Sequence, residues 1–414
     1  MTPFYARAKD EYFTNTRLLT RLNLNGKLGK TATWQLQNGF AFYQRFRNRY
    51  IRDMVNMTEE LDKSTGVQDT TRFYDFTFRG NYADKKGKLG YMVGYDVNLE
   101  KGVSGKIPDN TDQLQEFAAY ASLSYSVLKD KLTFQPALRA ALNNLYPAPL
   151  IPSFNVLYAP NSKVQLRTSY SKGFRAPSLK ELYLYFYDLN HEVEGNRNLK
   201  AEQGHHLQLS TSLTVYEKQA DFVKLLLTGY YNDIYDQISL YQPDSNRPLY
   251  ATYTNIARNN NFIISLQSDA QLGNFYTQVG YSITELLNNG SNLSTAMQAT
   301  ATVQYRWQKP RINFSLFYKW FGEQPRLVST IDGGAAFNGI TAPYSFVDAS
   351  VEKKFWQQRI QLIAGVKNLL DVTNTNVSGS TSGGVHSGGS GSSQNIAAGR
   401  SFFTSLRFTL QKDR

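Results

Sequence analysis

The sequence has 414 residues, no cysteine and a formal net charge of +12. The lack of cysteine excludes disulfides and thiolate metal sites. Lysine and arginine are spread along the chain, whereas a nucleic-acid-binding protein would concentrate them, so we expect no nucleic-acid partner. No run of about eighteen apolar residues occurs, which excludes a transmembrane helix, and the first residues lack the apolar core of a signal peptide.

Predicted strands follow one another from near Tyr12 to near Gln411. They show apolar and polar residues in strict alternation, which is typical of strands with two different faces. They are about ten residues or more in length, longer than the usual strand of a globular protein and long enough to cross a bilayer at a tilt. The clearest examples, in chain order, are residues 164–170, 207–215, 297–307 and 312–320.

Aromatic residues make up 14% of the chain, and several lie at the ends of predicted strands. This placement suits the aromatic girdles of a transmembrane barrel. The residues concerned are Trp34, Tyr305, Trp307, Tyr318 and Trp320.

The connections between strands alternate in length, as in outer-membrane barrels, where short turns lie on one rim and long loops on the other. Counting gives roughly 17 strands, although bacterial single-chain barrels use even numbers, so we expect the chain to lack its beginning. The short connections are 25–29, 83–88, 128–131, 160–163, 216–221, 272–274, 307–310 and 356–359, and the long ones 48–69, 100–113, 142–150, 174–204, 242–250, 286–295, 322–341 and 373–398.

Two motifs frame the long, tyrosine-rich connection at 174–204. The first is "FRAP", and the second lies within "GNRNLKAE". Together with the ending "GVKNLLDVTNTN" and "GRSFFTSLRFTL", they resemble the boxes and last strands of TonB-dependent outer-membrane receptors. The box residues are Phe174, Arg175, Ala176, Pro177, Asn196, Arg197, Asn198 and Leu199.

The resemblance implies an all-β, transmembrane antiparallel β-barrel in the bacterial outer membrane. Members carry a plug inside a 22-stranded barrel, so residues 1–414 are expected to be the C-terminal part of such a barrel, with about 17 of 22 strands and no plug or signal peptide. It also implies a TonB-type energy-coupling complex as partner, engaged through the missing N-terminal part, with outer-membrane lipid around the barrel. Oligomeric state is left open.

The ligand hypothesis comes from His191, because haem-uptake members of the family place a histidine between the two boxes. A neutral imidazole could ligate haem iron, and Tyr183, Tyr185 and Tyr187 could stack on the macrocycle. His386, in a Gly/Ser-rich segment, is a second candidate contact. The alternative is that these are ordinary loop residues without a role in ligand binding. In the haem hypothesis, haem is a transported ligand. No cofactor and no other metal are expected.

No catalytic constellation occurs in the sequence, so we expect no enzyme. The predicted function is energised uptake of a bulky, scarce nutrient, with haem or haem-protein iron first and a cobalamin or an iron–siderophore complex as the alternative. A surface lipoprotein or a haem protein is a candidate partner. Alternatives of another class are a passive porin and a β-rich surface adhesin.

Overall fold

The computed structural model describes residues 6–64, 67–105, 107, 111–183, 185–187, 192–241, 243, 247, 249–288, 292–329, 335–356, 358–378 and 392–409. His191 and His386 lie outside this part of the chain. No helix among the described residues is long and apolar enough to cross a membrane.

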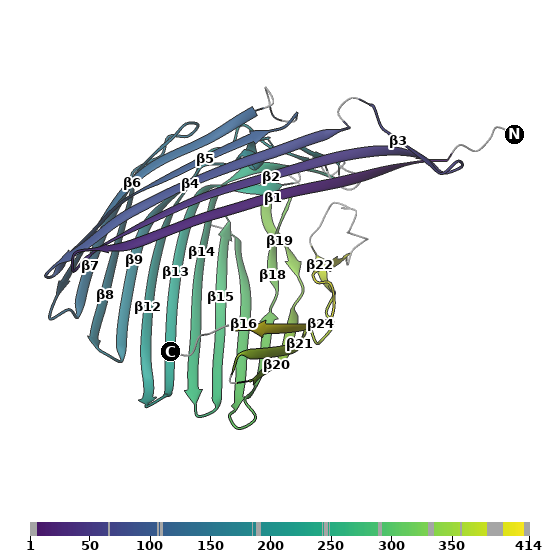
Figure 1. Ribbon diagram of the computed structural model, residues 1–414. Coiled ribbons are helices and arrows are strands. Elements are labelled where there is room, and N and C mark those ends of the chain that lie inside the picture. The colour runs from purple at the N-terminus through teal and green to yellow at the C-terminus, as the bar shows by residue number, and fades with distance from the viewer. Residues whose placement is uncertain are drawn as a thin grey trace.

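In the described part of the chain, seventeen strands form one antiparallel meander in which each strand pairs with the next. Figure 1 shows their arrangement. This confirms the predicted architecture and the strand count. The strands are β1 (Arg7–Leu28), β2 (Ala32–Asp53), β4 (Asp69–Lys86), β5 (Leu89–Val103), β6 (Thr111–Val127), β7 (Leu132–Asn143), β8 (Ile151–Asn161), β9 (Val164–Arg175), β12 (Glu202–Lys218), β13 (Asp221–Tyr241), β14 (Tyr250–Leu272), β15 (Phe275–Asn288), β16 (Asn292–Trp307), β17 (Ile312–Phe321), β20 (Tyr344–Phe355), β21 (Ile360–Lys367) and β24 (Ser401–Phe408).

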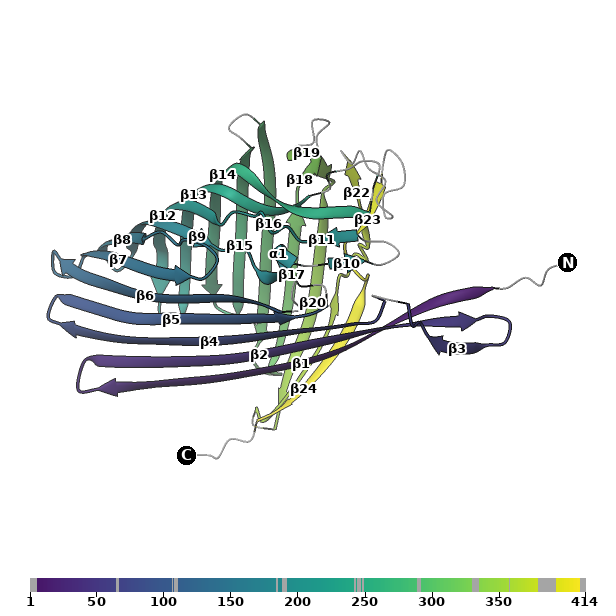
Figure 2. The same ribbon diagram turned by 90° about the horizontal axis from the view of Figure 1, so that it is seen from above.

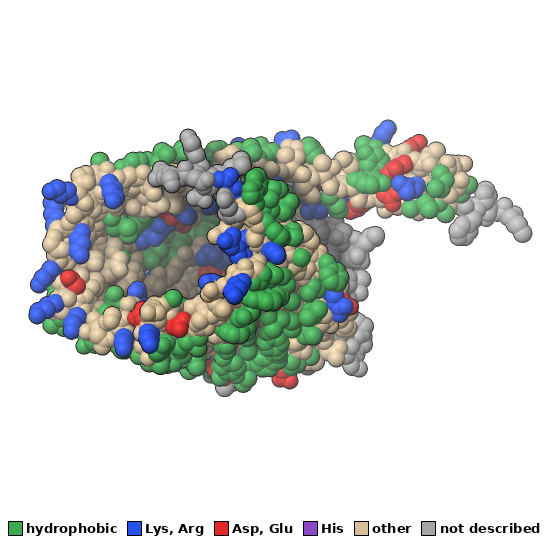
Figure 3. All heavy atoms as spheres, turned by 60° about the horizontal axis from the view of Figure 1, so that its bottom comes forward, with side chains coloured by type: hydrophobic (Ala, Val, Ile, Leu, Met, Phe, Trp, Pro, Cys, Tyr) green, Lys and Arg blue, Asp and Glu red, His purple; other side chains and the backbone are tan. Residues whose placement is uncertain are grey.

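The sheet curves around a hollow, which opens toward the viewer in Figure 3. Among the described residues, each of the two end strands of the meander pairs with a single other meander strand: β1 pairs with β2, and β24 pairs with β21. Figure 2 shows β1 and β24 along the same side of the molecule.

The register sorts the side chains onto two faces. Leu266 of β14 pairs with Leu227 and with Tyr281, and all three side chains are exposed on the outer face. Their neighbours Gln267 and Gln278 point inward and donate to Asp269. Hydrophobic side chains cover much of the outer surface seen in Figure 3, while charged side chains, mostly Lys and Arg, lie around the hollow. An apolar outer face and a polar inner face are the arrangement typical of a transmembrane β-barrel.

The short connections are tight turns that require left-handed backbone. Gly29, Gly87 and Gly273 have φ of +69°, +61° and +57° in the turns after β1, β4 and β14. A residue without Cβ adopts this conformation at little steric cost. The long connections hold small elements: β3 (Thr58–Leu61), α1 (Leu179–Tyr183), β10 (Tyr185–Tyr187), β11 (Glu192–Glu194), and a four-stranded sheet of β18 (Gln324–Ser329), β19 (Ala335–Thr341), β22 (Asn374–Ser378) and β23 (Ser392–Asn395).

Candidate functional site

The two boxes meet at the long-loop end of β9 and β12, where Arg175 joins them. Arg175 is the last residue of β9 and pairs in register with Glu202, the first residue of β12. Its guanidinium donates to both Glu202 oxygens at 2.7 and 2.6 Å and to Glu181 Oε2 at 2.9 Å. Bidentate, charge-assisted contacts of this kind are strong and directional. Arg175 thus ties the base of the connection to α1.

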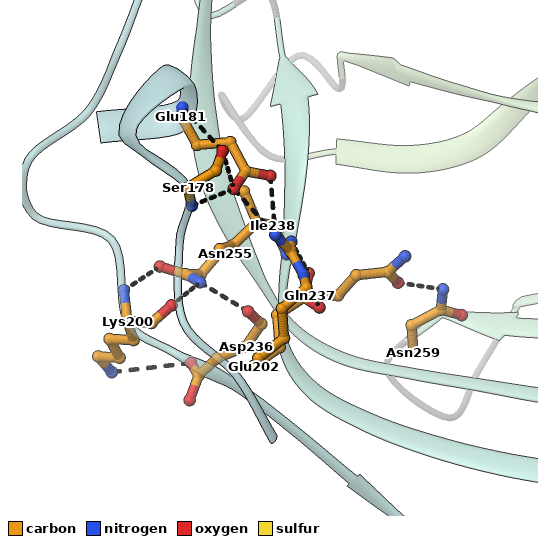
Figure 4. A network of polar contacts seen from close by, with 10 residues as sticks. Ser178, Glu181, Lys200, Glu202, Asp236, Gln237, Ile238, Asn255 and Asn259 are labelled. Carbon is orange, nitrogen blue, oxygen red and sulfur yellow. Dashed lines mark hydrogen bonds and ion pairs between the residues drawn. The ribbon is translucent and has the colours of Figure 1, made fainter. Parts of the chain in front are cut away.

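The start of α1 is organised by a capping box. The Ser178 hydroxyl accepts the Glu181 N–H at 3.3 Å, and the Ser178 N–H donates back to Glu181 Oε2 at 2.8 Å (Figure 4). This reciprocal pair satisfies two orphan donors of the helix start. Burial raises the pKa of the Glu181 carboxyl, but the hydrogen bonds from Arg175 and Ser178 outweigh it and hold the pKa below its ordinary value of 4.5. Pro177, just before the cap, is fully buried.

The second box packs directly against α1. The Asn196 N–H donates to the Glu181 carbonyl at 2.9 Å, and the Asn196 side chain donates to the Tyr253 carbonyl at 2.9 Å. Gly195 lies so close that an added Cβ would stand 2.6 Å from the backbone of Leu182. The glycine is therefore required by a close approach of two backbones.

Asn255 of β14 closes this network from the neighbouring wall. Its side chain accepts the Lys200 N–H at 2.9 Å and donates to the carbonyls of Lys200 and Asp236, as Figure 4 shows. Glu202 also accepts the Ile238 N–H at 2.7 Å. Leu182, Leu199 and Ile238 are buried beneath these contacts, with partly buried Tyr146, Tyr183 and Tyr253 packed against them. The boxes consequently form one compact unit, which we call the clasp: residues 175–183 and 195–202 with their partners on β13 and β14.

A cavity of about 610 Å³ lies beside α1, between the helix and the luminal faces of β1, β2, β4 and β5. Its volume falls in the range of small-molecule sites. Aromatic rings line it, among them Phe13, Tyr43, Phe73 and Tyr183. Its charged residues are Arg17, Arg45, Arg47, Lys180, Asp69, Asp75 and Glu100.

The predicted ligand residues meet different outcomes. His191 and His386 lie outside the described residues, and of Tyr185 and Tyr187 the structure describes the backbone, in β10. Tyr183 packs in the clasp, lines the cavity and has the Arg197 guanidinium 5.5 Å from its ring centre. Burial and a hydrogen bond to Asp112 raise the pKa of Tyr183 to about 12, so its phenol stays protonated at neutral pH. A ligand role for these residues stays a prediction.

The residues of the first box lie at the end of β9 and before α1: Phe174, Arg175, Ala176 and Pro177. The residues of the second box, Asn196 to Leu199, lie before β12. Of these, the structure gives Arg175, Pro177, Asn196 and Leu199 clear packing or hydrogen-bonding roles in the clasp. The adjacent His205 and His206 point to opposite faces of β12: His205 contacts Tyr170 at 2.9 Å, and His206 contacts Asn232 at 2.5 Å.

The cavity beside α1 and the arginines that line it were not predicted from the sequence. The signal was present in "YQRFRNRY" (43–50), where Arg45, Arg47 and Arg49 alternate with bulky or polar residues and so must share one face of β2. Within the described part of the chain, no group of three or more His, Asp or Glu side chains is arranged to hold a metal ion.

A family model described as "TonB dependent receptor-like, beta-barrel" matches residues 2–369. The chain is also 29% identical over 256 residues to the hemoglobin-haptoglobin-binding protein A of Haemophilus influenzae, a match that covers 58% of this chain and 22% of the relative. The chain thus spans about a fifth of the length of that relative.

Solved structures with the same fold include the ferric enterobactin receptor PfeA of Pseudomonas aeruginosa, with a TM-score of 0.62 at 15% identity over 96% of this chain and 70% of that one. The FrpB iron transporter of Neisseria meningitidis gives a TM-score of 0.58 at 13% identity, over 91% of this chain and 62% of that one. Identities this low establish the fold alone. These relatives are receptors and transporters, which agrees with the expectation that the chain is not an enzyme.

Proposed function

Because the chain belongs to the TonB-dependent receptor β-barrel family of the bacterial outer membrane, we propose that it forms the wall of a receptor for energised import of a bulky iron-bearing nutrient. Haem, free or carried by a haem protein, is the proposed cargo. The coupling energy comes from a TonB-type complex, which is the proposed partner. A passive porin and an adhesin are both disfavoured by the family match.

The observation that carries the haem proposal is the similarity to a protein named for binding hemoglobin and haptoglobin. His191 adds chemical support, because it lies between the two boxes and directly precedes Glu192 of β11. A neutral imidazole is the usual protein ligand of haem iron.

The clasp supports this role mechanically. It fixes both ends of the connection that carries His191: Arg175 binds Glu202 and Glu181, and Asn196 binds the backbone of α1 and β14. The hairpin of β10 and β11 is tied to the barrel wall by parallel pairing of β11 with β14. Side chains held by a firmly anchored scaffold lose less freedom when a ligand binds, which favours affinity.

An iron–siderophore complex is the second candidate, favoured by the fold shared with the ferric enterobactin receptor. Titration of the receptor in detergent separates the two. If haem is the cargo, the Soret band of haemin should shift on binding, and His191→Ala should abolish this shift. His206→Ala is the control, because it removes a luminal histidine held by Asn232, and it should leave the shift unchanged. A spectrum unchanged by His191→Ala removes that residue from iron ligation. Binding of ferric enterobactin with no binding of haemin would favour the siderophore candidate.

A further inference from the structure

An apolar groove of about 650 Å³ lies on the outer face of the sheet, where it crosses β16, β17, β20, β21 and β24. The register fixes the face, because the exposed outer residue Tyr281 pairs with Ala299 of β16, and Val303 lies four residues further along that strand. The groove therefore opens away from the hollow, toward the membrane. Its larger lining residues are Val303, Tyr305, Phe314, Leu316, Val351 and Phe402.

Two alanines form the floor of this groove. Ala349 of β20 and Ala364 of β21 carry only methyl groups on the outer face, and bulkier residues stand on either side of them. Leu316 pairs with Ala349 from the β17 side, and Phe402 of β24 borders the other side. The atoms that line such a trough lack close neighbours, so a flexible hydrocarbon chain that fills it gains many dispersion contacts.

A lysine stands at the short-turn end of the groove. Lys353 follows Val351 by two residues on β20, so its side chain points to the same outer face. It pairs with Ile312 of β17 and Leu362 of β21, which places one cation between two apolar residues. Its Nζ lies 5.3 Å from the centre of the Phe355 ring. A cation on the outer face of a barrel is least costly near the membrane interface, where it meets the headgroups.

Lys353 forms no ion pair with any carboxylate that the structure describes. The adjacent Glu352 points to the opposite face of the strand, where its Oε1 lies 3.7 Å from Lys354 Nζ. The charge of Lys353 is thus left for a group outside the described chain, and an anion at the outer face complements it.

The neighbouring turn places more positive charge beside Lys353. Residues 308–311 join β16 to β17, and both basic residues of this turn, Lys309 and Arg311, are exposed. The Arg311 carbonyl accepts the Lys354 N–H at 3.4 Å, so the turn lies directly beside the end of β20. In outer-membrane barrels the short turns face the periplasm. Basic residues at a membrane surface attract anionic lipid headgroups.

Trp307 marks the depth of the membrane interface at this position. It pairs with Ile312, which pairs in turn with Lys353, and it is 51% exposed. Tryptophan is enriched at the level of the headgroups. The groove extends from this level away from the short turns, along Val351 and Ala349. Cation and trough therefore follow each other in the order in which a phospholipid presents its phosphate and its acyl chains.

We propose that this groove holds an acyl chain of an anionic phospholipid from the periplasmic leaflet, with the phosphate at Lys353 and Arg311. A zwitterionic lipid would fill the trough equally well, but the cation without an acid partner favours a headgroup with a net negative charge. The proposal concerns the lipid around the wall, and it is independent of the cargo that the receptor imports.

The test is native mass spectrometry of the receptor that carries this chain, in detergent, with dioleoyl phosphatidylglycerol and dioleoyl phosphatidylcholine as probes. The wild type should bind the anionic lipid more tightly than the zwitterionic one. Lys353→Gln should weaken binding of phosphatidylglycerol about fivefold, the effect of one cation near an anionic surface, and leave phosphatidylcholine unchanged. Lys354→Gln is the matched control, because this lysine is adjacent but points to the opposite face, and it should change neither affinity.

A second variant tests the trough. Ala364→Phe fills the floor and should weaken binding of both lipids, whereas Ala119→Phe, at an exposed outer position of β6 away from the groove, should weaken neither. Equal affinity of the wild type for the two lipids, or equal losses in Lys353→Gln and Lys354→Gln, would overturn the proposal. A receptor dimer that Ala364→Phe separates in light scattering would assign the groove to a second copy and would also overturn it.

Discussion

Arg175 and Glu202 face each other at the last rung of the β9–β12 ladder, and two hydrogen bonds of 2.7 and 2.6 Å join the guanidinium to the carboxylate. Arg175 belongs to the first box, and Glu202 ends the stretch "GNRNLKAE" that contains the second box. The same arginine reaches Glu181 of α1, so a single side chain connects the first box, the helix and the second box.

Replacing Glu202 with Gln should loosen the clasp. The change removes a charged acceptor from Arg175 and weakens the bond to the Ile238 N–H, and we expect a loss of about 1–2 kcal/mol, limited because the Arg175 side chain is 44% exposed. Thermal unfolding in detergent measures it. Glu217→Gln, at an exposed position near the other end of β12, should change nothing, and equal midpoints for the two variants would contradict the role of the clasp.

Acidification should weaken the same region through Glu181. Because the pKa of this carboxyl is below its ordinary value of 4.5 in the folded protein, its contribution is present above that value and is lost as the pH falls through the folded pKa. The thermal midpoint should therefore drop between neutral pH and the acid side of 4.5. Glu181→Gln should show a smaller drop over the same range. If the variant and the wild type lose stability in parallel, Glu181 is not the group responsible.

Gly195→Ala should destabilise the clasp by steric conflict. The new Cβ would lie 2.6 Å from backbone atoms of Leu182 and Tyr183, which cannot move aside without shifting α1. Overpacking of this kind costs about 1–3 kcal/mol. Gly229→Ala in β13, where a Cβ meets nothing within 4 Å, is the control for the general effect of removing a glycine. Comparable unfolding midpoints for both variants would refute the close approach.

The assignment of the two faces can be tested on β14. Leu266 is 49% exposed on the outer face, whereas Gln267 points inward beside Asp269. Leu266→Arg should cost about 2–4 kcal/mol if that position faces lipid near the bilayer centre, while Gln267→Arg gains a nearby carboxylate and should be tolerated. Reversible folding into vesicles measures both. A reversed order of stability would mean that the faces are assigned the wrong way round.

Much of the wall could be predicted from sequence because alternation is a local property. The segment from Met297 to Trp307 shows two faces without any knowledge of its neighbours. The structure pairs four of its apolar residues with apolar residues of β15: Met297, Ala299, Ala301 and Tyr305. Helix α1 could not be predicted from periodicity, because five residues are too few for a helical period to appear. Its capping box, Ser178 with Glu181, was the available signal.

The cavity could not be predicted in this way. Arg17, Arg47 and Lys180 are far apart in the sequence, and they come together only because two ladders and the clasp set the register of β1 and β2 and the position of α1. A one-residue slip in either ladder would turn the side chains of the slipped strand to the other face. Their proximity is thus a property of strand pairing, which local sequence patterns do not contain.

The most direct test of the central claim is uptake of radiolabelled haem by cells that depend on the receptor carrying this chain. We expect uptake to require the receptor, to stop when a protonophore collapses the inner-membrane proton gradient, and to fall with His191→Ala but not with His206→Ala. Haem uptake that is the same in cells lacking the receptor, or that continues at full rate after the protonophore is added, would contradict the account.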